Sequence, residues 1–119
     1  MVEKILNKMS ELKSTYSYFG IRADDRLFSV GEYLPNSFNQ FDEVEPEEWE
    51  EINGTCATGF GYIWFDGEQD DVSEVEKALR INSQYIGDHQ YLIAGNSREY
   101  GNDEAEIIIQ DAVVVDVLK

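Results

Sequence analysis

Apolar positions near the start of the chain recur with the period of an α-helix. In MVEKILNKMSELK, charges interrupt every apolar run, and the apolar positions are Val2, Ile5, Leu6, Met9 and Leu12. This spacing places them on one face and predicts an amphipathic N-terminal helix. A secretory signal peptide needs an unbroken apolar stretch of about 7 to 15 residues, so we expect none here.

A second helical pattern lies in DVSEVEKALRINSQY and predicts an amphipathic helix near residues 72–84. Its apolar stripe consists of Val72, Val75 and Leu79, and Ala78 is a further candidate for it. Ser73 and Glu76 fit a capping box, in which side chains three residues apart satisfy free backbone N–H groups. A shorter helix is expected at PEEWEEI, where Pro46 suits the first turn.

The remaining apolar segments are typical of β-strands, because they are rich in β-branched and aromatic residues and end at turn-forming residues. They are YSYFGIR (16–22), RLFSV (26–30), GYIWF (61–65), HQYLIAG (89–95), and two runs in EAEIIIQDAVVVDVLK that form a hairpin or two neighbouring strands. Helices and strands in this order predict an α+β fold with a small, mainly antiparallel sheet.

The length and composition favour one folded domain that spans residues 1–119. The chain has 119 residues, 42% of them hydrophobic, and contains no segment near the roughly 20 apolar residues of a membrane span. Its single cysteine, Cys56, excludes an internal disulfide. We therefore expect a soluble cytoplasmic protein without a membrane partner, present as a monomer or a homodimer.

Charge is the unusual property of this sequence. The chain has 25 Asp and Glu against 9 Lys and Arg, which gives a formal net charge of -16. Binding to phosphates requires Lys and Arg to displace counterions, so direct binding to nucleic acid or to anionic lipid is excluded as a main activity. The natural partners of such a chain are basic surfaces.

The carboxylates concentrate in three groups. The first acidic group is Asp42, Glu43, Glu45, Glu47, Glu48, Glu50 and Glu51; the second is Asp66, Glu68, Asp70, Asp71, Glu74 and Glu76; the third is Glu99, Asp103, Glu104 and Glu106. Each group is either a solvated, solubilising face or a partner-binding surface. For a binding surface, Trp49 is the best candidate for an apolar anchor among the charges.

Carboxylates at this density can imitate a nucleic acid, since duplex DNA presents one negative charge per about 1.7 Å of axis. In size, charge and mixture of acidic and aromatic residues, the chain resembles the DNA-mimic proteins that phages and other mobile elements use against restriction enzymes, CRISPR nucleases and repair enzymes. The resemblance implies a non-enzymatic inhibitor without a cofactor, acting in the host cytoplasm. Its partner is then a basic, nucleic-acid-binding enzyme, contacted by the first acidic group and by Asp66, Glu68, Asp70 and Asp71.

An enzymatic alternative follows from three motifs, YFGIR, GTCAT and EAE. Their order and spacing resemble the arginine, serine and glutamate motifs of mono-ADP-ribosyltransferases, which use NAD. That resemblance implies that Arg22 contacts the NAD phosphates and that Thr55 or Thr58 braces the site. Glu106 then stabilises the ribose cation, and Glu104 orients the acceptor.

A calcium loop is the third possibility, because DGEQDD places Asp66, Glu68 and Asp70 at alternate positions. An EF-hand loop also needs Gly at its sixth position and Glu at its twelfth. This chain has Asp71 and Lys77 there. The sequence therefore predicts no dedicated metal site.

Overall fold

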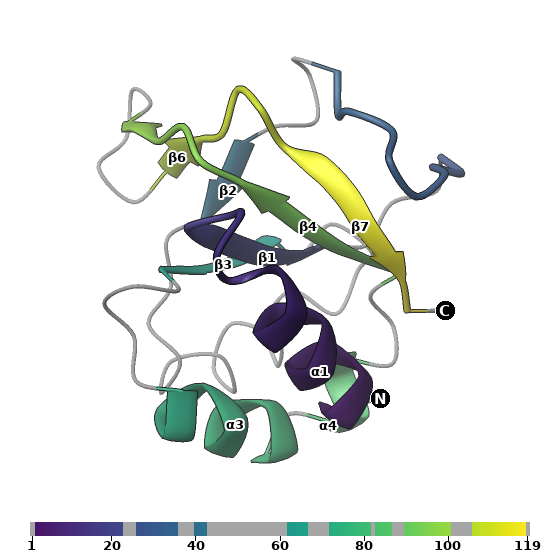
Figure 1. The fold of residues 1–119 in the computed structure, drawn as a ribbon, viewed down its shortest axis with the longest axis vertical. Coiled ribbons are helices and arrows are strands. Elements are labelled where there is room, and N and C mark those ends of the chain that lie inside the picture. Colours follow the sequence, from purple (N-terminus) through teal and green to yellow (C-terminus); the bar gives the residue numbers. More distant parts are fainter. Residues whose placement is uncertain are drawn as a thin grey trace.

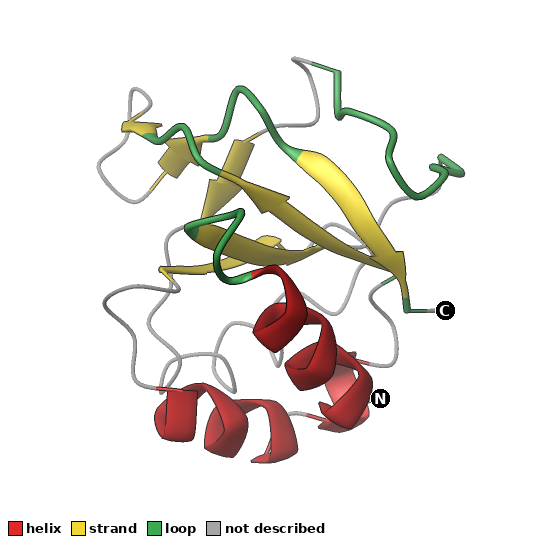
Figure 2. Cartoon of the chain, viewed as in Figure 1, coloured by secondary structure: helices red, strands yellow, loops and turns green. Residues whose placement is uncertain are grey.

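The computed structural model describes residues 2–22, 26–35, 40–42, 62–66, 72–81, 83–86, 90–100 and 106–118. In chain order the elements are α1 (Val2–Leu12), β1 (Tyr18–Arg22), β2 (Gln40–Asp42), β3 (Tyr62–Asp66), α3 (Val72–Ile81), α4 (Ser83–Ile86), β4 (Tyr91–Gly95), β5 (Glu99–Tyr100), β6 (Glu106–Ile108) and β7 (Val113–Val117) (Figure 1). The helices gather on one side of the strands (Figure 2). This arrangement confirms the predicted α+β fold.

The strands form two sheets. The large sheet has the order β3-β1-β4-β7 and the small sheet the order β2-β6-β5, and every pairing within them is antiparallel. In the large sheet, Tyr18 lies opposite both Asp66 and Gly95, while Arg22 lies opposite Tyr62 and Tyr91. The mainly antiparallel sheet expected from the sequence is therefore present.

Strand β4 is the centre of the core, because all five of its residues are buried. Successive side chains of a strand point to opposite faces. Leu92 and Ala94 accordingly belong to a cluster on the helix side, and Tyr91 and Ile93 to a cluster on the other side. An uninterrupted apolar run such as YLIAG is what a strand covered on both faces requires.

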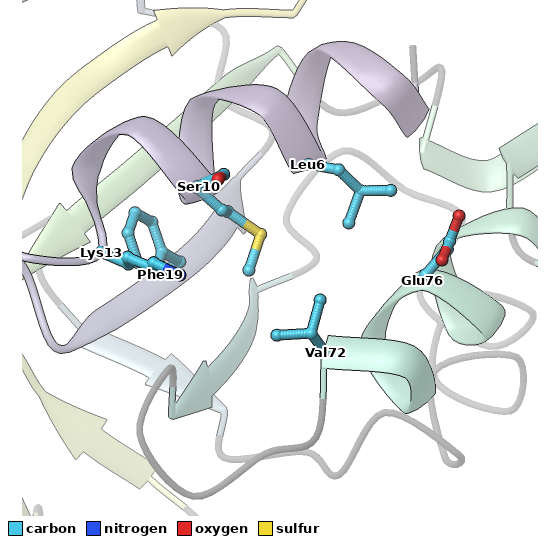
Figure 3. Close-up of a pocket in the computed structure, with 7 residues that line it drawn as sticks. Leu6, Ser10, Lys13, Phe19, Val72 and Glu76 are labelled. Carbon is cyan, nitrogen blue, oxygen red and sulfur yellow. The ribbon is translucent and has the colours of Figure 1, made fainter.

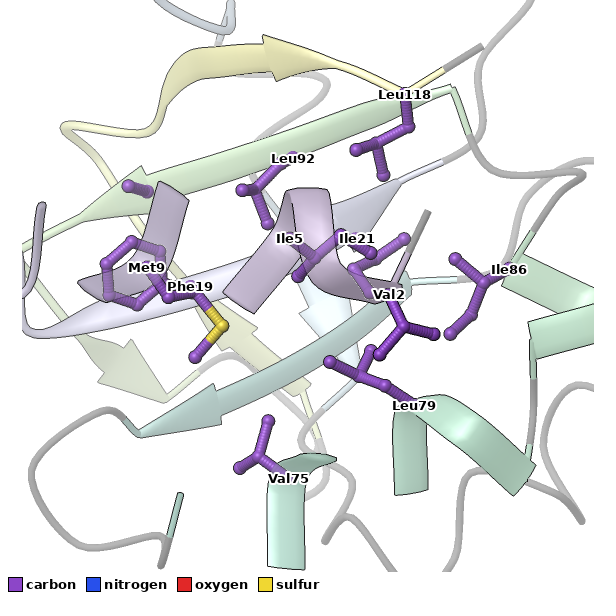
Figure 4. Packing of buried hydrophobic residues seen from close by; sticks show 11 residues of the cluster. Val2, Ile5, Met9, Phe19, Ile21, Val75, Leu79, Ile86, Leu92 and Leu118 are labelled. Atoms are coloured by element: carbon purple, nitrogen blue, oxygen red, sulfur yellow. The ribbon is translucent and has the colours of Figure 1, made fainter. Parts of the chain in front are cut away.

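The helix-side cluster joins both helical patterns to the sheet (Figure 4). Its buried residues are Val2, Ile5, Met9, Phe19, Ile21, Val75, Leu79, Ile86, Leu92, Ala94 and Leu118. The ammonium of Lys4 also fixes α1 to β7, since its Nζ donates to the Val117 carbonyl at 2.7 Å and lies 3.7 Å from a carboxylate oxygen of Asp116. The predicted amphipathic helix at the N-terminus is confirmed.

The second helical pattern is confirmed with two corrections. Val75 and Leu79 are buried, but Val72 is 63% exposed, so the predicted stripe is wrong at its first residue. Helix α3 begins at Val72, which puts Ser73 inside the first turn instead of at the N-cap. Helix α4 follows as a separate short element.

The expected strand at residues 26–30 is wrong. This segment is a loop whose backbone bonds to a side chain instead of a neighbouring strand. The hydroxyl of Tyr91 accepts from the Phe28 N–H at 2.9 Å and donates to the Arg26 carbonyl at 3.0 Å. These long-range bonds satisfy the backbone groups that a strand ladder would otherwise use.

The two C-terminal β-branched runs form strands that do not pair with each other. β7 pairs with β4 in the large sheet, and β6 pairs with β2 and β5 in the small one. Residues 109–112 make the turn between them, and Ala112 N–H donates to the Ile109 carbonyl. The expected hairpin or pair of neighbouring strands is therefore wrong, because the chain crosses from one sheet to the other.

Candidate functional site

The acidic groups of the sequence are attached to the small sheet and to its neighbour β3. β2 ends at Asp42, where the first acidic group begins, and β3 ends at Asp66, where the second begins. β2 and β3 contact each other (Figure 1). The fold thus brings together the two strands that lead into these groups, although they are distant in sequence.

The third acidic group joins the same region through β5 and β6. β6 pairs with β2, and its register sets Glu106 opposite Asp42. β5 contains Glu99 and pairs with the other side of β6. All three acidic groups are therefore connected by one small sheet and the strand beside it.

Most of the residues proposed to bind the partner lie outside the described part of the chain. They are Glu43, Glu45, Glu47, Glu48, Trp49, Glu50, Glu51, Glu68, Asp70 and Asp71, and Asp103 lies outside it as well. Their role in binding stays a prediction. The structure does show where the strands that precede these residues end: β2 ends at Asp42 and β3 ends at Asp66.

Two carboxylates of these groups already have partners in the fold. An oxygen of Glu76 lies 2.9 Å from a guanidinium nitrogen of Arg80, which is also 3.6 Å from Glu3. The hydrogen bond from Arg80 to Glu76 is the main cause that raises the pKa of Arg80. Glu99 accepts from the side-chain amide of Gln110 at 3.0 Å. By contrast, Glu74 is exposed in the first turn of α3.

The basic residues are concentrated in the described framework, where several have carboxylate partners. Lys119 is the one Lys or Arg that lies outside the described residues. Besides the ion pairs of Lys4 and Arg80, the ammonium of Lys8 lies 3.7 Å from a carboxylate oxygen of Glu11, and the guanidinium of Arg26 lies 3.5 Å from one of Glu32. The negative excess of the chain therefore falls mainly on the segments that leave β2, β3 and β5, not on the framework.

The junction between the sheets is held by the carboxylate of Asp111. Both of its oxygens are 2.9 Å from the N–H of Asn96, and Oδ1 accepts from the N–H of Ser97 at 2.8 Å. The Ser97 hydroxyl in turn accepts from the Gln110 N–H at 2.8 Å. Burial acts to raise the pKa of Asp111, but the hydrogen bonds from Ser97 and Asn96 outweigh it and lower the pKa below its usual value.

Gly95 is required beside this carboxylate. A Cβ at that position would lie 2.5 Å from Cγ2 of Ile109 and 2.9 Å from Oδ1 of Asp111. The side chain of Asn96 extends the brace to the turn after α1, because its Nδ2 donates to the Thr15 carbonyl and its Oδ1 accepts from the Ser17 N–H. These contacts hold the end of β4, from which the small sheet continues, against the N-terminal part of the fold.

The residues of the enzymatic alternative lie in different sheets or outside the described part of the fold. Arg22 is 0% exposed and lies opposite Tyr62 and Tyr91 in the large sheet. Glu106 lies opposite Asp42 in the small sheet. Thr55, Thr58 and Glu104 lie outside the described residues.

The proposed contact of Arg22 with dinucleotide phosphates stays a prediction. Among the described residues, no group of three or more His, Cys, Asp or Glu is arranged to hold a metal ion. No helix in the same part of the chain has the length and apolar composition of a membrane span.

Comparison with protein-family models, curated proteins and solved structures finds no match to this chain.

An exposed apolar loop is a feature that sequence reasoning missed. In residues 26–35, Leu27 is 86% exposed, Val30 61% and Tyr33 66%. The loop is nevertheless bonded to β7, because Gly31 N–H donates to the Val114 carbonyl and Leu34 N–H to the Ala112 carbonyl. The turn signal at Gly31 was visible in the sequence, but the partner strand that holds the loop was not.

Proposed function

We propose that this chain is a non-enzymatic binding protein whose acidic groups occupy the basic, nucleic-acid-binding surface of a partner protein. The observation that carries the proposal is the separation of charge. The described residues include every Lys and Arg except Lys119, and several of these cations form ion pairs with carboxylates. The strands β2, β3 and β5, in contrast, lead into the acidic groups. This is the distribution expected of a folded support for an anionic surface.

A folded support makes such a surface more effective than an acidic tail. Chain segments tied to a sheet at their ends lose less conformational entropy on binding than a free segment does. Concentrated charge also accelerates the encounter with a cationic groove, and this acceleration decreases with salt. Mimicry of DNA, as in anti-restriction or anti-CRISPR inhibitors, requires both properties and needs no cofactor.

The proposal is tested by capture of the partner. The purified chain is immobilised and exposed to a lysate of the organism that encodes it, at low and at high salt, and retained proteins are identified by mass spectrometry. We expect a nucleic-acid-handling enzyme that is retained at low salt, lost at high salt and displaced by added duplex DNA. A retained protein that DNA does not displace would argue against mimicry.

Glu106→Gln provides the control against the enzymatic alternative. The variant removes one of 25 acidic residues, so capture of the partner should be retained. Under the ADP-ribosyltransferase interpretation the same change would abolish turnover of NAD. NAD hydrolysis by the wild-type chain that disappears in this variant would replace the binding proposal with the enzymatic one.

A further inference from the structure

A small pocket lies between α1 and α3, over the start of β1 (Figure 3). Its volume is about 170 Å³, and it is lined by Leu6, Met9, Ser10, Lys13, Phe19, Val72 and Glu76. None of the acidic residues expected to bind a partner protein contributes to it. Glu76 belongs to the second acidic group, but its carboxylate is already bonded to Arg80 within the fold.

The interior of the pocket is apolar. Phe19 and Met9 are buried and belong to the helix-side cluster, so they form a fixed floor. Leu6 and Val72 face each other across the space in Figure 3. Val72 is 63% exposed although it lies at an apolar position of α3, so a ligand in the pocket would cover apolar surface that now contacts water.

The charged groups at the pocket differ in how far they are already neutralised. Glu76 accepts two hydrogen bonds from Arg80, at 2.9 Å from Nη2 and 3.3 Å from Nε. Lys13 follows directly after α1 and forms no ion pair with the described residues. The pocket therefore combines an apolar interior with one available cation and, one helical turn away, the hydroxyl of Ser10.

We propose that this pocket binds a small amphipathic carboxylate, with its apolar chain against Leu6, Met9 and Val72 and its carboxylate beside Lys13. An apolar cavity of about 150 Å³ accommodates benzene, so a chain of about six carbons matches the size. Small-molecule sites commonly combine an apolar lining with a few polar groups that fix orientation. The site does not depend on the proposed binding of a basic protein.

The net charge of -16 does not exclude an anionic ligand at this place. Fields from exposed charges are screened beyond about 8 Å at physiological salt. The lining itself supplies one carboxylate, Glu76, which is bonded to Arg80, and one ammonium, Lys13. Lys13 forms no ion pair with the described residues, so a carboxylate beside its ammonium is favoured over a cation of the same shape.

The test compares hexanoate with 1-hexanol and hexylamine in NMR titrations of the full chain. We expect hexanoate to shift the methyl signals of Leu6, Met9 and Val72, with a dissociation constant of about 1 mM, as expected of so small a ligand. 1-Hexanol should bind more weakly and hexylamine most weakly. Equal or tighter binding of hexylamine, or no shift with hexanoate at saturating concentration, would overturn the proposal.

Variants locate the two parts of the site. Lys13→Met should reduce hexanoate affinity about three- to fivefold, the size expected of an exposed ion pair, and leave 1-hexanol unaffected. Lys77→Met removes the same charge from an exposed position of α3 that does not line the pocket and should change neither ligand. Val72→Trp fills the pocket from an exposed position, so the fold is retained and binding of both ligands is lost. Equal effects of Lys13→Met and Lys77→Met would contradict a specific carboxylate site.

Discussion

At the scale of single residues, acidic side chains in this chain have different roles according to their surroundings. Asp111 accepts backbone hydrogen bonds from Asn96 and Ser97 at the junction of the sheets, and Glu76 is bonded to Arg80. The sequence analysis placed Glu76 in the second acidic group and in a capping box with Ser73, although Glu76 and Arg80 have the i,i+4 spacing of an ion pair on the predicted helix. No pattern in the sequence distinguished Asp111, because its hydrogen-bond partners Asn96 and Ser97 lie 14 or 15 positions away.

The first prediction concerns Asp111. Asp111→Asn should lower the free energy of unfolding by about 1–2 kcal/mol at pH 7, the lower part of the range for charged hydrogen bonds because the group is partly exposed to solvent. The folded-state pKa is lowered, so this stability is present above the unfolded pKa, about 3.9, and is lost as the pH falls through the folded value. Denaturant unfolding at several pH values measures it.

Glu99→Gln is the control for Asp111, since it neutralises an exposed carboxylate near the same junction. It should change the free energy of unfolding by less than about 0.5 kcal/mol. A difference between wild type and Asp111→Asn that persists unchanged at pH 2 would contradict the role given to the charged carboxylate.

The second prediction concerns Gly31, whose φ angle is +90°. No atom lies within 4 Å of a Cβ built there, so the cost of a side chain is one of backbone conformation alone. Gly31→Ala should destabilise the chain by about 1–2 kcal/mol. Gly31→Asn should cost clearly less, because asparagine tolerates positive φ better. Equal unfolding midpoints for the two variants would show that the turn relaxes.

At the scale of elements, the pattern of apolar residues was sufficient to locate the helices and strands that it marks as apolar on one face or along their whole length. The α1 stripe and the apolar runs of β1, β3 and β4 were all located from the sequence, with ends within two residues of those observed. The pairing of the strands was harder to predict from the sequence, because each strand pairs with partners that lie far away along the chain. Residues 26–30 form a loop because their backbone bonds to the hydroxyl of Tyr91. β6 and β7 belong to different sheets because β6 pairs with β2 and β7 pairs with β4.

The third prediction separates buried from exposed positions of α3. Leu79 is 0% exposed in the helix-side cluster, so Leu79→Ala should lower the free energy of unfolding by about 2–5 kcal/mol. Val72→Ala, on the same predicted stripe but exposed, should cost less than about 0.5 kcal/mol. Chemical denaturation of both variants measures the difference. Similar losses would mean that α3 packs along its whole length.

At the scale of the whole molecule, the composition predicted the strong negative charge, and the fold shows which strands lead into the acidic groups. The charge of -16, and the expectation that the chain does not bind phosphates directly, follow from the residue counts alone. The sequence could not show that β2, β3, β5 and β6 join the three acidic groups, since these pairings and contacts are long-range. Nor could it place Arg22 in the interior, because an arginine near the end of a strand is equally compatible with an exposed site.

The most direct test of the binding proposal is the salt dependence of affinity for the captured partner, measured for two variants of equal net charge. Glu47→Lys/Glu48→Lys changes the first acidic group, and Glu3→Lys/Glu11→Lys changes exposed positions of α1. We predict that wild type and the α1 variant lose affinity steeply with salt, whereas the first variant binds more weakly and shows a smaller slope. Affinity independent of salt, or equal slopes for the two variants, would contradict electrostatic mimicry by the acidic groups.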